Sequence, residues 1–284
     1  MFRNSMSNKY NNIRIINDKL IKTGPIDTIK AEYVMYSFIN KNSILQQNFP
    51  ILYNFIEEND KATIEIEYIR GITLYERHKQ QLLVKKDIEN ILNLVSLFHS
   101  QTFEIIINEE NIKTHYYEKL NKRFAEIDQY PFNDLSNIKV KILKLLNKYL
   151  EYNKINISSF IHGDLWFNNI LIDYKGHIKC IDTRGMINNI YTSNGDTLYD
   201  YAKLYQSILG FDYAVYGDKI EYTYLNKIRT IFEEEVQKRN INLTILKHIT
   251  IVLMAGSIYF LDCFEKKERV WNLIKKILDE ITLE

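Results

Sequence analysis

Residues 160–172, which read Phe-Ile-His-Gly-Asp-Leu-Trp-Phe-Asn-Asn-Ile-Leu-Ile, constrain the fold more than any other stretch of this sequence. Polar residues at fixed offsets, among them His162, Asp164 and Asn169, lie between two short apolar runs. Apolar runs of this length on either side of a polar loop are typical of buried strands. The pattern therefore predicts a rigid polar loop that is held between two strands.

A second hairpin is predicted directly after this loop. Residues 173–176 predict a turn, and residues 177–181 predict a strand that ends at Asp182. The hairpin would bring Asp182 back beside Asn169. Asp164 and Asn169 are five residues apart, as in the catalytic loop of kinases, where the Asp accepts the proton of the acceptor hydroxyl and the Asn binds Mg²⁺. One Asp as base, with an Asn and an Asp for the metal ions, is the set of groups that phosphoryl transfer needs.

A third motif lies at residues 195–204, Gly-Asp-Thr-Leu-Tyr-Asp-Tyr-Ala-Lys-Leu, where Asp196 is placed to cap a helix. Together the three motifs resemble the aminoglycoside phosphotransferase and choline kinase-like family of small-molecule kinases. That family reads H-G-D-L-x-x-x-N-I-L, then a strand ending in I-D, then G-D-x-x-x-D-L-A. The matching residues here are His162 to Leu165, Asn169 to Leu171, Ile181-Asp182, Gly195-Asp196 and Asp200 to Ala202.

The resemblance implies a bilobal α+β fold of the protein kinase type. A small, abbreviated β-rich lobe would span residues 1–69 and bind the nucleotide, and a helical catalytic lobe would span residues 70–284. The resemblance also implies roles for particular side chains: Asp164 as the base, Asn169 and Asp182 as Mg²⁺ ligands, and His162, Asp196 and Asp200 as supports of the loop.

The N-terminal region offers a candidate lysine for the nucleotide phosphates. In kinases, a Lys on a strand holds the α- and β-phosphates and pairs with a Glu on the next helix. Lys22 and Glu32 fit this arrangement, and Lys19 and Lys30 are the competing lysines. The apolar spacing predicts two short strands and then a helix, at residues 13–16, 19–22 and 26–39.

The next segment is similar to the hinge that receives adenine in this family. Strands are predicted at residues 49–55 and 62–69, and the hinge residues would be Glu67, Tyr68 and Ile69. No glycine precedes Lys22, although kinases cover the phosphates with a glycine-rich hairpin. The remaining segments predict helices at residues 73–81, 84–101, 113–128, 136–153, 197–209, 219–239, 243–264 and 268–283.

The net charge of +1 gives no general attraction to nucleic acid or to an anionic membrane. The longest apolar run, residues 249–260, is interrupted by polar residues and predicts a buried helix and no membrane span. Two distant cysteines, Cys180 and Cys263, are expected to be buried free thiols in a reducing compartment. No signal peptide is recognised, so we expect a cytoplasmic protein. The sequence predicts no oligomeric state.

Arg184 departs from the family pattern, which more often has an aromatic or acidic residue beside the metal-binding Asp. Its guanidinium would either bind a phosphate of the nucleotide or a charged acceptor, or pair with Asp164, Asp196 or Asp200. The two interpretations remain open at this point.

The leading hypothesis is a kinase that uses ATP and Mg²⁺ to phosphorylate a hydroxyl of a small molecule. Candidate acceptors are a sugar or surface-polysaccharide precursor, an amino alcohol such as choline, and an aminoglycoside. The alternative is a catalytically silent pseudokinase scaffold that binds nucleotide, which the missing glycine loop favours. A protein kinase is a third candidate, but no A-P-E-like segment follows Asp182.

Overall fold

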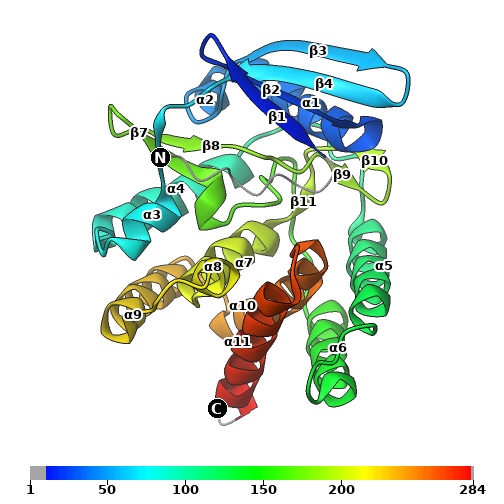
Figure 1. Cartoon of the computed structure of the whole chain (residues 1–284), viewed down its shortest axis with the longest axis vertical. Coiled ribbons are helices and arrows are strands. Elements are labelled where there is room, and N and C mark those ends of the chain that lie inside the picture. The colour runs from blue at the N-terminus through cyan, green and yellow to red at the C-terminus, as the bar shows by residue number, and fades with distance from the viewer. Residues whose placement is uncertain (1–10, 283–284) are drawn as a thin grey trace.

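The computed structural model describes residues 11–282 of the chain. Within this range, the N-terminal part is a four-stranded antiparallel sheet with helix α1 packed against it (Figure 1). The strands lie in the order β1-β2-β4-β3. The elements are β1 (Asn12–Ile16), β2 (Lys19–Pro25), α1 (Ile26–Asn40), α2 (Ser43–Gln46), β3 (Leu52–Glu58) and β4 (Lys61–Glu67).

The alternating pattern of β4 explains how this sheet packs. Ala62, Ile64 and Ile66 are buried, whereas the residues between them are partly exposed. These side chains belong to the same core as Ile29 and Tyr36 of α1. The predicted β1–β2 hairpin and the predicted helix after it are therefore both confirmed.

The chain leaves the N-terminal sheet after β4 and continues into β5, which belongs to a second sheet. In the described part of the chain, this sheet has three strands in the order β5-β7-β8. Its strands are β5 (Gly71–Thr73), β7 (Ile170–Asp173) and β8 (Ile178–Cys180). A Cβ atom on Gly71 would lie 2.4 Å from the carbonyl oxygen of Ile172. Glycine is required there because β5 and β7 approach so closely. The hairpin predicted after the polar loop is confirmed as β7–β8. The strand expected to lead into the loop at Phe160-Ile161 was wrong, because the preceding strand, β6, ends at Ser158.

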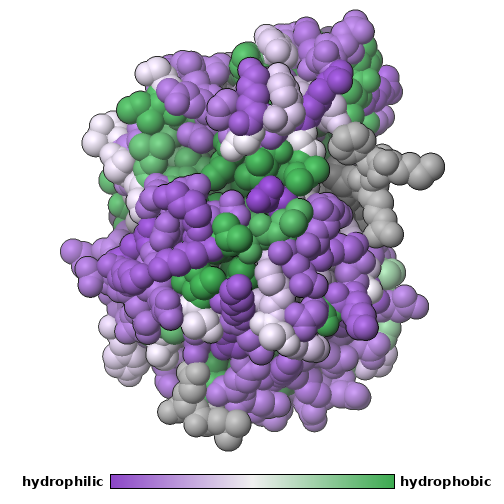
Figure 2. Space-filling model, turned by 90° about the vertical axis from the view of Figure 1, so that its left-hand side faces the viewer, coloured by the Kyte–Doolittle hydropathy of each residue, from purple (hydrophilic) through white to green (hydrophobic). Residues whose placement is uncertain are grey.

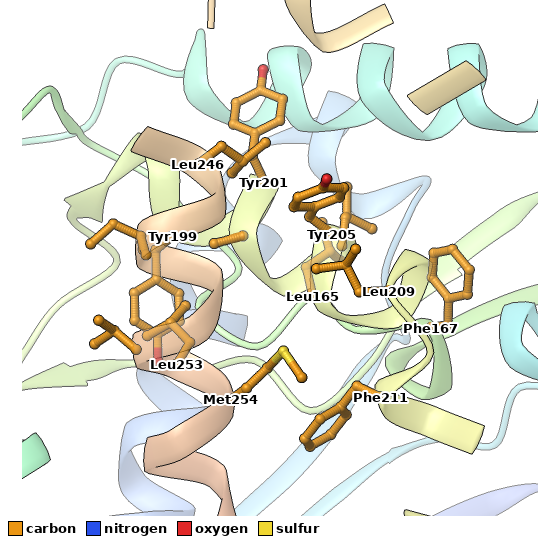
Figure 3. Close-up of a cluster of buried hydrophobic side chains, with 14 of the residues drawn as sticks. Leu165, Phe167, Tyr199, Tyr201, Tyr205, Leu209, Phe211, Leu246, Leu253 and Met254 are labelled. Atoms are coloured by element: carbon orange, nitrogen blue, oxygen red, sulfur yellow. The ribbon is translucent and has the colours of Figure 1, made fainter. Parts of the chain in front are cut away.

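Helices build the larger part of the molecule, in which α7 lies against α10 (Figure 1). Tyr199, Tyr201 and Tyr205 of α7 join Leu246, Leu253 and Met254 of α10 in one buried cluster (Figure 3). The helices are α3 (Leu74–Lys79), α4 (Lys85–His99), α5 (Glu109–Ile127), α6 (Leu135–Tyr152), α7 (Thr197–Ile208), α8 (Phe211–Tyr216), α9 (Tyr222–Lys238), α10 (Leu243–Ser257) and α11 (Phe264–Thr282).

Short elements complete the fold and hold the polar loop in place. Strand β6 precedes the loop and pairs with β11 directly before α7, and β9 pairs with β10. Their bounds, with those of the two 3₁₀ turns, are β6 (Ile157–Ser158), η1 (Phe167–Asn169), β9 (Met186–Ile187), β10 (Ile190–Tyr191), β11 (Gly195–Asp196) and η2 (Ile258–Phe260).

Three expectations about the C-terminal region were wrong. The helix expected over residues 243–264 ends at Ser257, because the ammonium group of Lys267 binds the carbonyl oxygens of Ile258 and Tyr259 at the helix end. Helix α8 was not expected; glycines with positive φ flank it on both sides. Cys263 is exposed, although Cys180 is buried as expected.

The apolar stretch Leu243–Phe260 is long enough to cross a membrane by length and composition alone. Two-thirds of it, 67%, is buried inside the structure among the described residues. A core helix has the same properties, so the stretch is weak evidence for a membrane span.

Candidate active site

Lys22 of β2 connects the N-terminal sheet to the polar loops of the larger part. Its Nζ lies 2.8 Å from Oε2 of Glu32 on α1 and 2.8 Å from Oδ1 of Asp182, which follows β8. Lys22 and Glu32 are buried, whereas the side chain of Asp182 is 47% exposed. Burial lowers the pKa of Lys22, but the two carboxylates outweigh burial and raise the pKa overall. Lys22 therefore carries its charge.

The two competing lysines are occupied elsewhere. Lys19 pairs with Glu65 at 3.2 Å, and Lys30 pairs with Glu57 at 3.2 Å. Both pairs are partly exposed, and neither includes Asp182. Lys22 is thus the lysine that meets both a glutamate of α1 and the aspartate after β8.

Asp200 of α7 fixes the backbone of the polar loop. Its fully buried carboxylate accepts hydrogen bonds from the backbone N–H groups of His162 at 2.9 Å and Gly163 at 2.8 Å. His99 Nε2 lies 3.2 Å from the same carboxylate. Gly163 has a φ of +77°, a conformation that glycine adopts without strain. The loop therefore turns sharply between His162 and Asp164, directly over α7.

Asp196 supports the same loop from the other side. Its carboxylate caps α7 by accepting the N–H of Leu198 at 3.0 Å. The hydroxyl groups of Tyr116 and Tyr149 also donate to it, at 2.9 and 2.6 Å. Because Asp196 and Asp200 are both buried and already accept several hydrogen bonds, both support the loop and the start of α7.

The side chain of Asp164 is 32% exposed, so part of its carboxylate reaches the surface of the protein. Its Oδ1 lies 2.9 Å from Nζ of Lys203, and the amide nitrogen of Asn169 donates to its backbone oxygen at 2.9 Å and to its Oδ2 at 3.2 Å. Burial raises the pKa of Asp164, but Lys203 and then Arg184 outweigh burial and hold the pKa at about 2. The carboxylate is ionised and held in one orientation.

Asn169 and Asp182 lie side by side across the β7–β8 hairpin. The backbone N–H of Ile181 donates to the carbonyl oxygen of Asn169 at 3.0 Å, which places the next residue, Asp182, beside it. Asp182 has a φ of +57°, a conformation that costs a non-glycine residue some energy and is enriched at functional sites.

These two side chains fit a magnesium ion. The amide nitrogen of Asn169 is used by Asp164, so its oxygen points the other way and accepts no hydrogen bond among the described residues. One carboxylate oxygen of Asp182 contacts Lys22, and the half-exposed side chain leaves the other available. Carboxylate and amide oxygens are the ligands that Mg²⁺ prefers, usually one or two of them per site.

His162 is fully buried and stacks on Phe49 at 6.1 Å. Its Nδ1 accepts the backbone N–H of Asp164 at 3.2 Å, and its carbonyl oxygen accepts the N–H of Arg184 at 2.9 Å. Burial lowers the pKa of the ring. His162 thus ties the Asp164 loop to the segment that follows Asp182.

The predicted hinge residues differ in the backbone groups that they leave free. The N–H of Glu67 donates to Ile51 at 2.8 Å, and the N–H of Tyr68 donates to Asp18 at 3.0 Å. In the described chain, the backbone of Ile69 makes no hydrogen bond. Hydrophobic surface gathers where the sheet meets the helical part, on the side where the connection to α3 runs (Figure 2). Ile69 is thus the hinge residue whose N–H is available.

Strand β1 alone precedes the Lys22 strand within the described range. In kinases the phosphate-covering hairpin comes before the lysine strand. The expectation of a missing glycine-rich hairpin therefore falls largely on residues 1–10, which lie outside the described residues.

Arg184 makes no direct ion pair within 4.0 Å with Asp164, Asp196 or Asp200 among the described residues, but it and Asp164 act on each other through their charges. Its guanidinium instead donates to the hydroxyl of Tyr199 and lies over the ring of that tyrosine, 5.1 Å from its centroid. Gly163 packs against it, since a Cβ there would come within 2.9 Å of the Arg184 Cβ.

Three further cations near Asp164 were missed from the sequence: Lys203 of α7 and Lys119 and Arg123 of α5. The signal for Lys119 and Arg123 was present, because residues 115, 119 and 123 recur every four positions and share one face of a helix. Lys203 gave no such signal, since its partner Asp164 is distant in sequence.

The chain is similar to known kinases in part of its sequence and in its fold. Residues 72–184 match the model of the ecdysteroid kinase-like family. No curated protein matches the chain in sequence.

Solved structures of small-molecule kinases share the fold. An aminoglycoside phosphotransferase from Streptomyces rimosus, solved with ADP and streptomycin, is 15% identical with a TM-score of 0.56, over 86% of this chain and 92% of that one. Choline kinase from Cryptosporidium parvum is 13% identical with a TM-score of 0.59, over 98% of this chain and 88% of that one. A thermostable mutant of another aminoglycoside phosphotransferase is 13% identical with a TM-score of 0.58, over 92% and 87%.

The resemblance to the aminoglycoside phosphotransferase and choline kinase-like proteins is therefore confirmed for the fold. The chain has the protein kinase-like fold of small-molecule kinases, with a small sheet-rich N-terminal region and a helical C-terminal part, as expected.

Proposed function

We propose that this chain, with its protein kinase-like fold, is a phosphotransferase that uses ATP and Mg²⁺ to phosphorylate a hydroxyl group of a small metabolite. The observation that carries the proposal is the bridge from Lys22 to Glu32 and Asp182, next to the loop that holds Asp164 and Asn169. A nucleotide-binding lobe of residues 1–69 and a catalytic lobe of residues 70–284 form part of the proposal. The acceptor classes under consideration are a sugar or surface-polysaccharide precursor, an amino alcohol such as choline, and an aminoglycoside.

Each side chain has a role in this proposal. Lys22, held by Glu32, binds the α- and β-phosphates, and the backbone of Ile69 receives adenine. Asn169 and Asp182 hold Mg²⁺, which would neutralise charge on the phosphates when bound. Solved relatives support nucleotide binding, because their crystals contain ADP or AMP-PNP.

Asp164 orients the acceptor. The acceptor oxygen forms a bond to the γ-phosphorus while the bond from that phosphorus to the ADP oxygen breaks, and the hydroxyl proton leaves toward Asp164. The ion pair with Lys203 keeps this carboxylate ionised and makes it a weak base. A weak base suffices because phosphoryl transfer has a loose transition state that depends mainly on positioning and charge.

Release of ADP in the presence of a panel of alcohols tests the proposal. Asp182→Ala is expected to lower turnover about 1,000-fold, because it removes a metal ligand. The control is Asp262→Ala, which removes an exposed carboxylate that pairs with Lys266, at a position outside the site. Circular dichroism would verify that both variants fold. Near-normal turnover in folded Asp182→Ala would contradict the metal role, and Mg·ATP binding without turnover on any acceptor would indicate the pseudokinase scaffold.

A further inference from the structure

A group of cations surrounds the hydroxyl of Tyr199, at the start of α7. Lys119 Nζ donates to this hydroxyl at 3.0 Å and the guanidinium of Arg184 donates to it as well. Both cations also lie over the tyrosine ring, 5.3 and 5.1 Å from its centroid. Arg123 lies one turn further along α5 and acts on both Arg184 and Lys119 through its charge. We call Lys119, Arg123, Arg184 and Tyr199 the basic cluster.

The cluster has no carboxylate of its own. Within the described residues, Lys119, Arg123 and Arg184 form no ion pair within 4.0 Å, and their polar partners are neutral. One such partner is His115, whose Nε2 lies 3.4 Å from Lys119 and whose pKa is lowered to about 2 by burial and then by Lys119 and Arg184. Asp164 acts on all three cations through its charge, but it is already paired with Lys203 at 2.9 Å, so positive charge remains in excess around it.

Holding these charges together opposes folding. Burial, and then the neighbouring guanidinium of Arg184, lowers the pKa of Lys119 well below its ordinary value and that of Arg123 to about 10. Repulsion of this kind is typical of sites that bind an anion and is costly without one. The hydroxyl oxygen of Tyr199 accepts hydrogen bonds from two cations, Lys119 and Arg184. The hydroxyl proton has no acceptor among the described residues, so it is available to an anion.

Two members of the basic cluster line a narrow pocket beside the Asp164 loop. Arg184, Tyr199 and Gly163 line this pocket, and so does Asp196, whose carboxylate oxygens already accept from Tyr116, Tyr149 and the N–H of Leu198. Gly163 is the residue directly before Asp164. The groups assigned to the nucleotide, in contrast, are Lys22 and Glu32 of the N-terminal sheet and helix.

We propose that the acceptor is an anionic alcohol, a small molecule that carries a phosphate or carboxylate group beside the hydroxyl that is phosphorylated. The anion binds Lys119, Arg123, Arg184 and the Tyr199 hydroxyl, and the hydroxyl group faces Asp164. This inference rests on the proposed function and selects among its acceptor classes: choline and aminoglycosides, which are cations, are excluded by the same charges.

A panel of matched acceptors tests the proposal with ADP release. Each set keeps one sugar and changes its charge: glucose, glucose 6-phosphate, glucuronate and glucosamine, then ribose and ribose 5-phosphate, with choline and kanamycin as further cations. We expect turnover with phosphorylated or carboxylated members and at least 10-fold lower kcat/KM with neutral and cationic ones. The phosphate and carboxylate members distinguish the two anions. Preference for a neutral or cationic acceptor would overturn the proposal.

Variants of α5 separate acceptor binding from nucleotide binding. Lys119→Gln and Arg123→Gln are each expected to raise KM for the anionic acceptor about 10- to 100-fold and to leave KM for ATP unchanged. The matched control is Lys122→Gln, which removes the same charge from an exposed position of the same helix. A change in KM for ATP with no change for the acceptor would assign the cluster to the nucleotide and overturn the proposal.

A binding measurement distinguishes failure of this proposal from failure of the proposed function. Inorganic phosphate is the probe, with chloride at equal ionic strength as reference, and thermal melting is the readout. Phosphate should raise the Tm of the wild type and of Lys22→Met, but not of the Lys119→Gln/Arg123→Gln double variant. That result supports the cluster even if no alcohol is phosphorylated. Equal stabilisation of the wild type and the double variant would overturn it.

Discussion

The carboxylate of Asp200 determines the position of the polar loop, because it accepts the N–H groups of His162 and Gly163 inside the protein. Asp200→Ala would leave both donors buried without an acceptor. We expect the free energy of unfolding to fall by about 3 kcal/mol, measured by urea denaturation. Asp262→Ala, at an exposed position, should change it by less than about 0.5 kcal/mol. A loss below about 1 kcal/mol in Asp200→Ala would show that the loop does not depend on this contact.

Asp212 of α8 should make stability depend on pH. Burial raises its pKa from 3.8 to about 6, and one of its oxygens accepts from Asn168 while the other has no partner among the described residues. The folded state binds the proton more tightly than the unfolded state, so the free energy of unfolding falls as pH rises from about 4 to 6. In the wild type this proton accounts for a fall of up to about 3 kcal/mol in the free energy of unfolding over that range. Asp212→Asn should abolish the fall, as measured by denaturation at several pH values. Parallel pH profiles for variant and wild type would contradict the assignment.

Single side chains were predictable from the sequence only where the motif fixes their neighbours. The Lys22–Glu32 pair could be anticipated because a strand followed directly by a helix brings the two together. Lys203 could not, because its position on a buried helix face and its contact with Asp164 depend on how α7 packs under the loop. Lys119 and Arg123 were recognisable as one face of a helix, but not as the face turned to Tyr199.

The segment after Asp182 is locked against α1 by a glycine. A Cβ on Gly185 would lie 1.9 Å from the carbonyl oxygen of Ala31, the residue before Glu32. Gly185→Ala should therefore push this segment away from α1, weaken the contact of Lys22 with Asp182, and lower both turnover and stability, the latter by about 2 kcal/mol.

Gly176 provides the comparison for Gly185. A Cβ there would meet no atom within 4 Å, although its φ of +85° disfavours alanine. Gly176→Ala should cost about 1 kcal/mol through backbone strain and leave turnover nearly unchanged. If both alanine variants had the same turnover, close packing at Gly185 would not control the site.

Long, strongly periodic elements were predicted well, and very short ones were not. The helices expected over residues 26–39, 84–101 and 136–153 lie within about two residues of α1, α4 and α6. The two-residue strands β6, β9, β10 and β11 are too short for a periodic pattern, and they form because distant segments meet. Helix α8 was hidden for a related reason, since glycines bound its six residues and signalled only a turn.

Over the whole molecule, Lys22 links the sheet to the helical part, so nucleotide binding should stabilise both together. At about 100 times its Kd, Mg·ATP should raise the free energy of unfolding by about 2.7 kcal/mol. This gain should be lost in Asp182→Ala and kept in Asp262→Ala, as measured by calorimetry or thermal melting. A gain that survives in Asp182→Ala would place the metal and nucleotide elsewhere.

Helix α7 carries Tyr199, Asp200 and Lys203 within little more than one turn, and its other faces are packed against α10. The three groups that shape the acceptor end of the site therefore move as one rigid body. A substitution that changes the volume of Met254, which is buried beneath α7, would shift all three at once. Changes in acceptor choice during evolution can therefore arise in the hydrophobic layer beneath the site, without any exchange of the residues that touch the substrate.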